Sequence, residues 1–258
     1  MAVTRDWVVL KLGGELLEGA GRYEAMAGVI AGAARRTRLA VVHGGGREVD
    51  AALARAGIEK RQVDGVRVTD EATLDVVVAV LAGAAAVGLT GADARLVVVA
   101  PAEPHVAVDG SVTDLGRVGT PRGAASAALL VALADAGCVP VIASIGASPD
   151  GTLYNVNADT FAAHLAGAVA GRLVIAGATA GVLDRSGHTI PALDREARAG
   201  LIASGVASAG MVAKLRACDD ALAGGAREVV LVDGRDPQAV SAATVGVTES
   251  APSTRMVA

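Results

Sequence analysis

The chain has 258 residues, enough for one large α/β domain or for two lobes, and 52% of them are hydrophobic, so a sizeable core can form. Only 2% of the residues are aromatic, so aliphatic side chains and alanine must build that core. The net charge is −4 and no basic face is evident, which argues against nucleic acid as the main partner.

Short apolar runs alternate with helical patterns along the chain. The strands that we expect cover residues 8–12, 39–43, 85–89, 96–99, 139–145, 173–175 and 229–232. The expected helices cover residues 23–35, 47–56, 70–82, 124–136, 159–170, 195–203 and 211–223. Several strands are apolar on both faces, which is typical of a parallel sheet covered by helices. The alternation therefore predicts a doubly wound α/β fold.

Two Asp-Gly pairs predict β-hairpins that interrupt this alternation, at residues 62–68 and 106–112. Hairpins in such a fold often cover a ligand cleft. A glycine-bearing segment at residues 177–181 suggests a boundary between two lobes. We expect an N-terminal lobe over residues 1–175 and a C-terminal lobe over residues 176–258.

The compartment can be argued from two further features. The first residues contain no apolar signal core, and the longest charge-free stretch, residues 76–92, is interrupted by glycines and Thr90. We therefore expect no membrane partner. The two cysteines, Cys138 and Cys218, are far apart and lack metal-binding spacing, which favours buried free thiols and a cytoplasmic location.

Glycine-bearing turns directly follow apolar residues in several places. They lie at residues 11–14, 43–46 and 210–214, and the first and last of them carry Lys11 and Lys214. Glycine lets backbone N–H groups approach an anion closely, and a lysine ammonium can follow a phosphoryl group as it moves. The pattern predicts a site that binds a chain of phosphates and transfers a phosphoryl group, although neither GxxxxGK[ST] nor GxGxxG occurs.

Five segments then point to a family. In chain order they are VLKLGG at 9–14, VVHGGG at 41–46, GVRVTD at 65–70, YNVNAD at 154–159 and GMVAK at 210–214. Together they resemble the amino-acid kinase family, over nearly the whole chain. The segments that contain Arg67 and Asn155 resemble most the members that phosphorylate N-acetyl-L-glutamate.

The resemblance implies a three-layer αβα sandwich with a mainly parallel central sheet. The N-terminal lobe would bind the amino-acid substrate and form a homodimer, and the C-terminal lobe would bind ATP. The implied reaction is ATP-dependent phosphorylation of the side-chain carboxylate of N-acetyl-L-glutamate to N-acetyl-L-glutamyl 5-phosphate, in arginine biosynthesis. Mg²⁺ is expected to arrive with the nucleotide, without an assigned protein ligand.

The same resemblance assigns the site residues. It makes Lys11 and Lys214 the ammonium groups that face the transferred phosphoryl group from opposite sides, with Asp159 between them. The residues expected to bind the substrate are Gly45, Gly46, Arg67, Asn155 and Asn157. The residues expected to bind the nucleotide are Gly13, Gly14, Ala178, Thr179, Ala180, Gly181, Val182, Leu183, Gly210 and Met211.

In three places the chain departs from the family pattern. At the Gly83–Ala84 junction the chain lacks about a helix of residues that relatives place there. Ala178 replaces an aspartate, which is expected to weaken or alter nucleotide binding. Few residues precede Val8, which leads us to expect a homodimer without inhibition by arginine.

Two other functions stay open on the sequence. A kinase for N-acylated aminoadipate would need a pocket longer by about one methylene, a difference worth only ~1–3 kcal/mol. A non-catalytic binding or regulatory protein of the same fold would account for Ala178. That reading gives no reason for the presence of both lysines and Asp159.

Overall fold

In this computed structural model, the structure describes residues 5–13, 16, 22–44, 85–106, 112–205, 207–247 and 251–257. Four predictions about local structure lie outside the described residues: the helices at 47–56 and 70–82, the hairpin at 62–68 and the Gly83–Ala84 junction.

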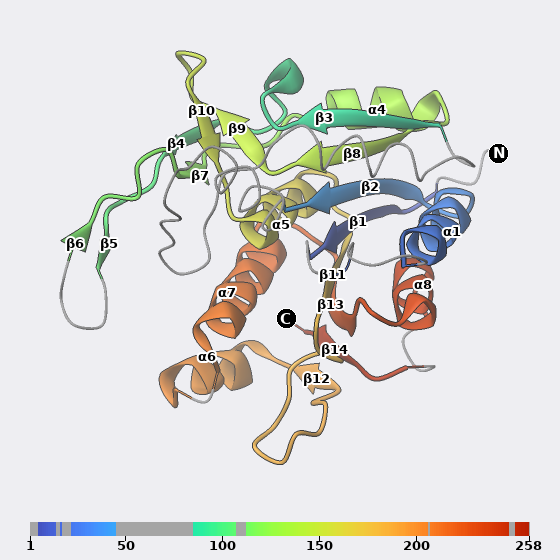
Figure 1. Ribbon diagram of the computed structural model, residues 1–258, viewed down its shortest axis with the longest axis vertical. Coiled ribbons are helices and arrows are strands. Elements are labelled where there is room, and N and C mark those ends of the chain that lie inside the picture. The colour runs from blue at the N-terminus through green and yellow to red at the C-terminus, as the bar shows by residue number, and fades with distance from the viewer. Residues whose placement is uncertain are drawn as a thin grey trace.

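An eight-stranded sheet forms the centre of the molecule, in the order β12-β14-β13-β11-β1-β2-β8-β3 (Figure 1). Its longer strands are mostly parallel, and β14 is antiparallel to β13. The strands are β1 (Trp7–Leu12), β2 (Arg38–His43), β3 (Ala86–Thr90), β8 (Val139–Ala143), β11 (Arg172–Gly177), β12 (Ala192–Leu193), β13 (Glu228–Asp233) and β14 (Ser253–Met256). This mainly parallel sheet confirms the predicted α/β fold.

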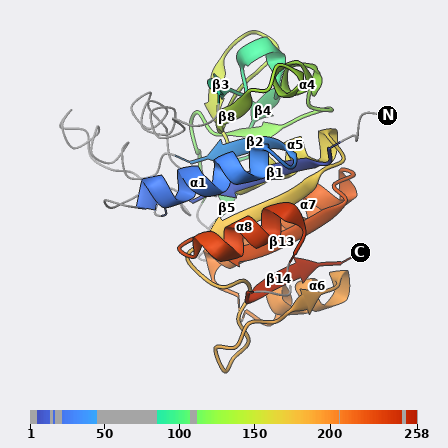
Figure 2. The same ribbon diagram turned by 90° about the vertical axis from the view of Figure 1, so that its right-hand side faces the viewer.

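Helices cover both faces of the sheet and complete the three layers (Figure 2). One face carries α1 (Arg22–Ala34) and α8 (Pro237–Val245), and the other carries α4 (Ala128–Asp135), α5 (Ala158–Ala168) and α7 (Ala209–Ala223). A further helix, α6 (Arg195–Ala203), packs against α7 and β12 near the β12 edge of the sheet.

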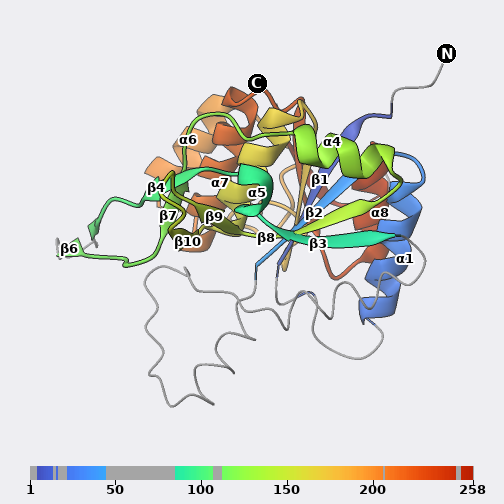
Figure 3. The same ribbon diagram turned by 90° about the horizontal axis from the view of Figure 1, so that it is seen from above.

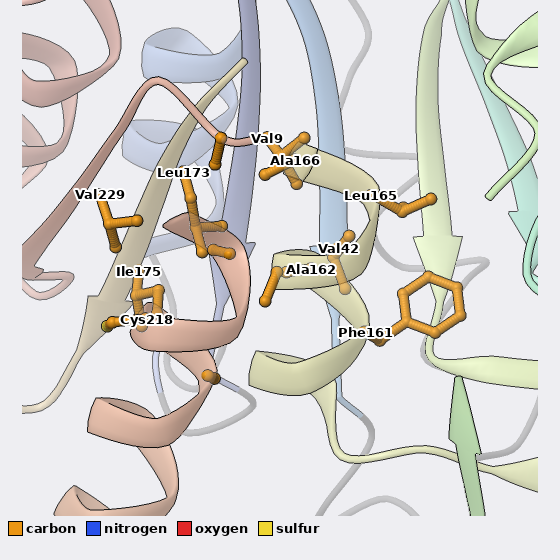
Figure 4. Close-up of a cluster of buried hydrophobic side chains, with 14 of the residues drawn as sticks. Val9, Val42, Phe161, Ala162, Leu165, Ala166, Leu173, Ile175, Cys218 and Val229 are labelled. Carbon is orange, nitrogen blue, oxygen red and sulfur yellow. The ribbon is translucent and has the colours of Figure 1, made fainter. Parts of the chain in front are cut away.

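The alternation of side chains along each strand divides the core into two clusters. In β1, Val9 belongs to the cluster under α5 and α7, whereas Val8 and Leu10 belong to the cluster under α1 and α8. Figure 4 shows the first cluster, in which Phe161 and the other labelled side chains of α5 pack on the strands. The strands are buried on both faces, as the continuous apolar runs predicted.

Three small antiparallel pairs extend beyond the carboxyl end of β8. They are β4 (Val99–Pro101) with β7 (Gly119–Pro121), β9 (Ile145–Ala147) with β10 (Leu153–Asn155), and β5 (His105–Val106) with β6 (Val112–Thr113). The β5–β6 pair projects away from the body of the molecule (Figure 3). Val106 pairs with Val112 in antiparallel register, which confirms the two strand ends of the hairpin predicted at 106–112. The turn between them lies outside the described residues.

Two strand predictions need correction. Leu96 and Val97 are buried, but only Val99 of the predicted strand 96–99 enters a strand, and that strand pairs with β7 outside the main sheet. The run from Val139 to Ile145 breaks at Ser144 into β8 and β9. In both cases the apolar run correctly predicts that the residues are buried, but burial does not determine which strand they pair with.

The predicted boundary between lobes at residue 175 falls inside β11, within the continuous sheet, and stays a prediction. Among the described residues, no helix combines the length and the apolar character needed to cross a bilayer. Both cysteines are free thiols. Cys218 is buried, and burial raises its pKa, whereas Cys138 is only half-buried.

Glycine brings α5 and α7 into unusually close contact. A Cβ atom built at Gly167 of α5 would lie 2.6 Å from the backbone oxygen of Gly224, directly after α7. No side chain fits at that separation, so the spacing of the two helices depends on the missing Cβ.

We expect Gly167→Ala to reduce the free energy of unfolding by about 1–3 kcal/mol, because the added methyl group forces the helices apart. Gly200→Ala in α6 is the matched control, since nothing lies within 4 Å of a Cβ there. The control should be neutral or stabilising by up to about 1 kcal/mol. Urea unfolding of both variants checks the prediction, and equal stabilities would contradict it.

Candidate active site

Lys11 is the second-last residue of β1, and the parallel strands β2 and β11 flank β1 on its two sides. It is in register with Val42 of β2 and Ile175 of β11. By strand alternation its side chain shares the face of Val9, which packs under α5 and α7. Lys11 is only 7% exposed. A lysine this buried requires an anionic partner.

That partner is Asp159, in the first turn of α5. The side chain of Asn157 caps the helix, because its Oδ1 accepts from the backbone N–H of Asp159 at 2.9 Å and of Thr160 at 3.2 Å. The cap fixes where α5 begins and therefore which residue faces β1. The Asp159 side chain is 6% exposed.

Asp159 bridges two lysines that are far apart in the sequence. The Nζ atom of Lys11 lies 2.8 Å from Asp159 Oδ1, and the Nζ atom of Lys214, on α7, lies 3.2 Å from Asp159 Oδ2. Lys214 passes close to Gly177 at the end of β11, where a Cβ would be 3.8 Å from its Cε. The structure thus brings together the three residues predicted to be catalytic. Their catalytic role stays a prediction.

The charges of this group are unevenly exposed to solvent. Burial alone would raise the pKa of Asp159, but the ammonium groups of Lys11 and Lys214 outweigh burial and hold that pKa below its ordinary value. The group therefore carries one negative and two positive charges at neutral pH. Lys214 is 26% exposed, so its side of the group is the more open to a ligand. A net positive charge here can attract an anion such as a phosphoryl group.

The residues predicted to bind the substrate divide into two sets. Gly45, Gly46 and Arg67 lie outside the described residues. Asn155 is 8% exposed and ends β10, where its backbone N–H donates to Arg117. Asn157 uses its side-chain oxygen to cap α5, so the structure gives it a positioning contact with Asp159. Substrate contacts for both asparagines stay predictions.

The residues predicted to bind the nucleotide lie near the ends of β1 and β11 and at the start of α7. Gly14 lies outside the described residues, and the N–H of Gly13 donates to Ala176 at 3.3 Å. Gly210 and Met211 lie in the first turn of α7, where Ser208 caps the helix. The positive end of the α7 dipole therefore lies at the two residues of this helix that are predicted to bind the nucleotide.

The loop after β11, residues 178–183, is tied to the C-terminal strand by Thr254. The Thr254 Oγ1 accepts from the N–H of Val182 at 2.8 Å and donates to the carbonyl of Ile190 at 2.6 Å. Gly181 has φ +111°, and a Cβ there would lie 2.4 Å from Thr254 Oγ1. The predicted nucleotide loop thus depends on a residue about seventy positions away along the chain. Ala178 in this loop is exposed and has no side-chain acceptor.

Sequence reasoning missed Thr254 and two further residues of this region, Arg198 and Asp219. Arg198 is 2% exposed and pairs with Asp219 at 2.7 Å. Nothing in the sequence distinguished Arg198 from a solvated arginine of a surface helix, and no strand was predicted around Thr254.

No cluster of three or more His, Cys, Asp and Glu side chains suited to a metal ion occurs within the part of the chain that the structure describes. Both oxygens of Asp159 already contact lysines, which makes it a poor metal ligand.

A family model described as the amino acid kinase family matches residues 6–233, nearly the whole chain. The chain belongs to the amino acid kinase family. The ion-paired group, the ends of β1 and β11 and all of α7 lie within the matched residues.

Two similar curated proteins are both named acetylglutamate kinase. The chain is 41% identical to the acetylglutamate kinase of Methanopyrus kandleri, over 87% of this chain and 94% of that protein. It is 38% identical to the acetylglutamate kinase of Caulobacter vibrioides strain NA1000 / CB15N, over 92% of this chain and 86% of that protein.

A solved structure supports the fold alone. The N-acetylglutamate synthase of Neisseria gonorrhoeae, in complex with coenzyme A and N-acetylglutamate, superposes with a TM-score of 0.79 at 23% identity. The superposition covers 99% of this chain and 60% of the synthase chain.

Another titratable group, His43, is the last residue of β2 and directly precedes Gly44. It is fully buried, and neither ring nitrogen has a hydrogen-bond partner among the described residues. It pairs in register with Leu12, one residue beyond Lys11. Burial lowers the pKa of His43 to about 4, so the ring is neutral at neutral pH.

We expect His43 to make the fold sensitive to mild acid. The native pKa lies below the ordinary value of 6.5, so the unfolded chain takes up the proton first. The stabilisation is complete above about pH 6.5 and falls by about 3 kcal/mol as the pH drops to about 4. Urea unfolding across this range should show a flatter profile for His43→Leu. The wild-type slope in His43→Leu would contradict the prediction.

Proposed function

We propose that the chain is an acetylglutamate kinase. It transfers the γ-phosphoryl group of ATP to the side-chain carboxylate of N-acetyl-L-glutamate, which gives N-acetyl-L-glutamyl 5-phosphate and ADP. The observation that carries the proposal is the buried Asp159 carboxylate with one lysine on each oxygen. The name shared by relatives that are 38–41% identical to this chain supports the choice of substrate.

The chemistry needs little proton transfer. The substrate carboxylate is already ionised at neutral pH, so one of its oxygens can attack the γ-phosphorus without a general base. A bond forms between that oxygen and phosphorus, and the bond between phosphorus and the β,γ-bridging oxygen breaks. The obstacle is the repulsion between two anions, and catalysis therefore depends on position and electrostatics.

Lys11 and Lys214 supply that electrostatic stabilisation in the proposed mechanism. Asp159 fixes both ammonium groups near one point, so neither must be reoriented when negative charge moves from the attacking oxygen to ADP. The partly exposed Lys214 approaches from α7, the helix whose first turn holds Gly210 and Met211, and the buried Lys11 approaches from β1. This arrangement is the basis for assigning Lys214 to the nucleotide side.

The binding residues keep their predicted roles in the proposal. Asn155, at the end of β10, would bind the acetylated amino acid together with Gly45, Gly46 and Arg67. The loop at residues 178–183 would bind the nucleotide, with Ala178 contributing backbone groups only. Mg²⁺ would accompany the phosphates of ATP, and no step is assigned to a metal held by the protein.

The family resemblance supports a proposal for the quaternary structure and the pathway, and the two free cysteines support one for the location. We propose a cytoplasmic homodimer, with the substrate in the N-terminal lobe and ATP in the C-terminal lobe, acting in arginine biosynthesis. Small molecules are then the partners that the site recognises.

Trapping of the acyl phosphate with hydroxylamine tests the reaction directly. Purified protein with ATP, Mg²⁺ and N-acetyl-L-glutamate should form the hydroxamate, and N-acetyl-L-2-aminoadipate should react with a kcat/KM lower by about 10-fold or more. No product from N-acetyl-L-glutamate would reject the proposal. A higher kcat/KM for the aminoadipate would instead assign the longer substrate.

We expect Lys11→Met and Lys214→Met each to lower kcat by about 10²–10³-fold, because each removes one charge that stabilises the transition state. Arg227→Met is the matched control. It also removes one positive charge, from an exposed ion pair with Asp6, and should change kcat by less than about twofold. Circular dichroism establishes that the variants are folded. A Lys11→Met enzyme with the wild-type rate would refute the assigned mechanism.

A further inference from the structure

Arg198 is a buried arginine that joins three segments of the C-terminal region. Its Nε donates to Asp219 Oδ1 on α7 at 2.7 Å. Its Nη1 donates to the carbonyl of Leu193 in β12 at 2.7 Å and to the carbonyl of Val257, directly after β14, at 2.8 Å. Because the side chain is only 2% exposed, these contacts replace water around the guanidinium.

The contact with Asp219 affects the helix that carries Lys214. Asp219 lies five residues after Lys214 on α7, which is about 7.5 Å along the axis. An α-helix is stiff over that length, so the contact at Asp219 also constrains the height and rotation of Lys214. The cap at Ser208 constrains the other end of the same helix.

The contact with Val257 affects the nucleotide loop. Val257 directly follows β14, and Thr254 of that strand holds the loop at 178–183 through Val182. Figure 1 shows α6, α7, β12 and β14 gathered at the same end of the molecule. A continuous path of hydrogen bonds and backbone thus links the loop, β14, Arg198 and α7.

We propose that Arg198 is a positioning residue that fixes the nucleotide loop relative to Lys214. The inference rests on the proposed function, because it takes the loop and α7 as the two parts of the nucleotide site. Arg198 itself contacts no substrate in this proposal. Its guanidinium suits the task, since one rigid planar group can donate to a side chain and to two carbonyls.

The test compares Arg198→Met with Arg172→Met. Arg172 also forms an arginine–carboxylate contact, at 2.6 Å to Glu228, but at the opposite ends of β11 and β13 from the loop. Both variants lose a half-buried or buried ion pair and should lose stability. Binding of a fluorescent N-methylanthraniloyl analogue of ATP and the KM values of both substrates are measured at a temperature where every variant is folded.

We expect Arg198→Met to raise the Kd of the ATP analogue and the KM for ATP by about tenfold, with the KM for N-acetyl-L-glutamate changed by less than about twofold. Arg172→Met should leave all three constants within about twofold. Similar losses of stability in the two variants with unchanged nucleotide binding in both would overturn the proposal, because Arg198 would then be structural only.

Two further variants keep the test decisive. Asp219→Asn keeps the size of the side chain and removes its charge, so it should raise the Kd of the ATP analogue even if Arg198→Met does not fold. Thr254→Val removes the contact with the loop, and its effect on that Kd should be non-additive with that of Asp219→Asn. Additive effects, or no effect of Asp219→Asn, would overturn the proposal.

Failure of the proposed function is recognised separately. A wild-type protein that binds the ATP analogue but forms no hydroxamate would reject the acetylglutamate kinase assignment, and the Kd measurements would still decide the role of Arg198. A wild-type protein that does not bind the analogue would reject both.

Discussion

The structure of this site depends on one buried carboxylate. Asp159 lies between Lys11 and Lys214, and the contacts with both ammonium groups stabilise its charge. Removal of any one of the three leaves a buried charge without its full complement. The group therefore fixes the end of β1, the start of α5 and the first turns of α7 relative to one another, and it leaves one net positive charge for an anionic ligand.

The surrounding fold holds those three elements in place by different means. β1 lies in the centre of a sheet that is buried on both faces, which fixes the depth of Lys11. Asn157 fixes the first turn of α5 by capping it. The contact between Gly167 and Gly224 sets the distance from α5 to α7. Each of these contacts involves only a few residues. Together they bring Lys11 and Lys214, which are far apart in the sequence, to the same carboxylate, as phosphoryl transfer requires.

The C-terminal region adds a second level of organisation. The Thr254 hydroxyl forms hydrogen bonds with two backbone groups of the segment after β11, the N–H of Val182 and the carbonyl of Ile190. The Arg198 guanidinium donates to two backbone carbonyls, one in β12 and one in the residue after β14. These contacts are made by polar side chains in places where an apolar side chain would leave backbone groups unpaired. The region around the loop at residues 178–183 is thus specified by hydrogen bonds, whereas the sheet is specified mainly by apolar burial.

The sequence by itself determined the alternation of strands and helices, because apolar periodicity is a local pattern. Its motifs also gave the resemblance to the family, and that resemblance singled out Lys11, Asp159 and Lys214. It did not determine that residues 96–99 leave the main sheet, that Asn157 caps α5, or that the side chains of Thr254 and Arg198 form hydrogen bonds with distant segments. Those facts are contacts between segments far apart in the chain. An arginine or threonine has the same local pattern whether it faces water or a buried carbonyl, so only the tertiary structure could decide between them.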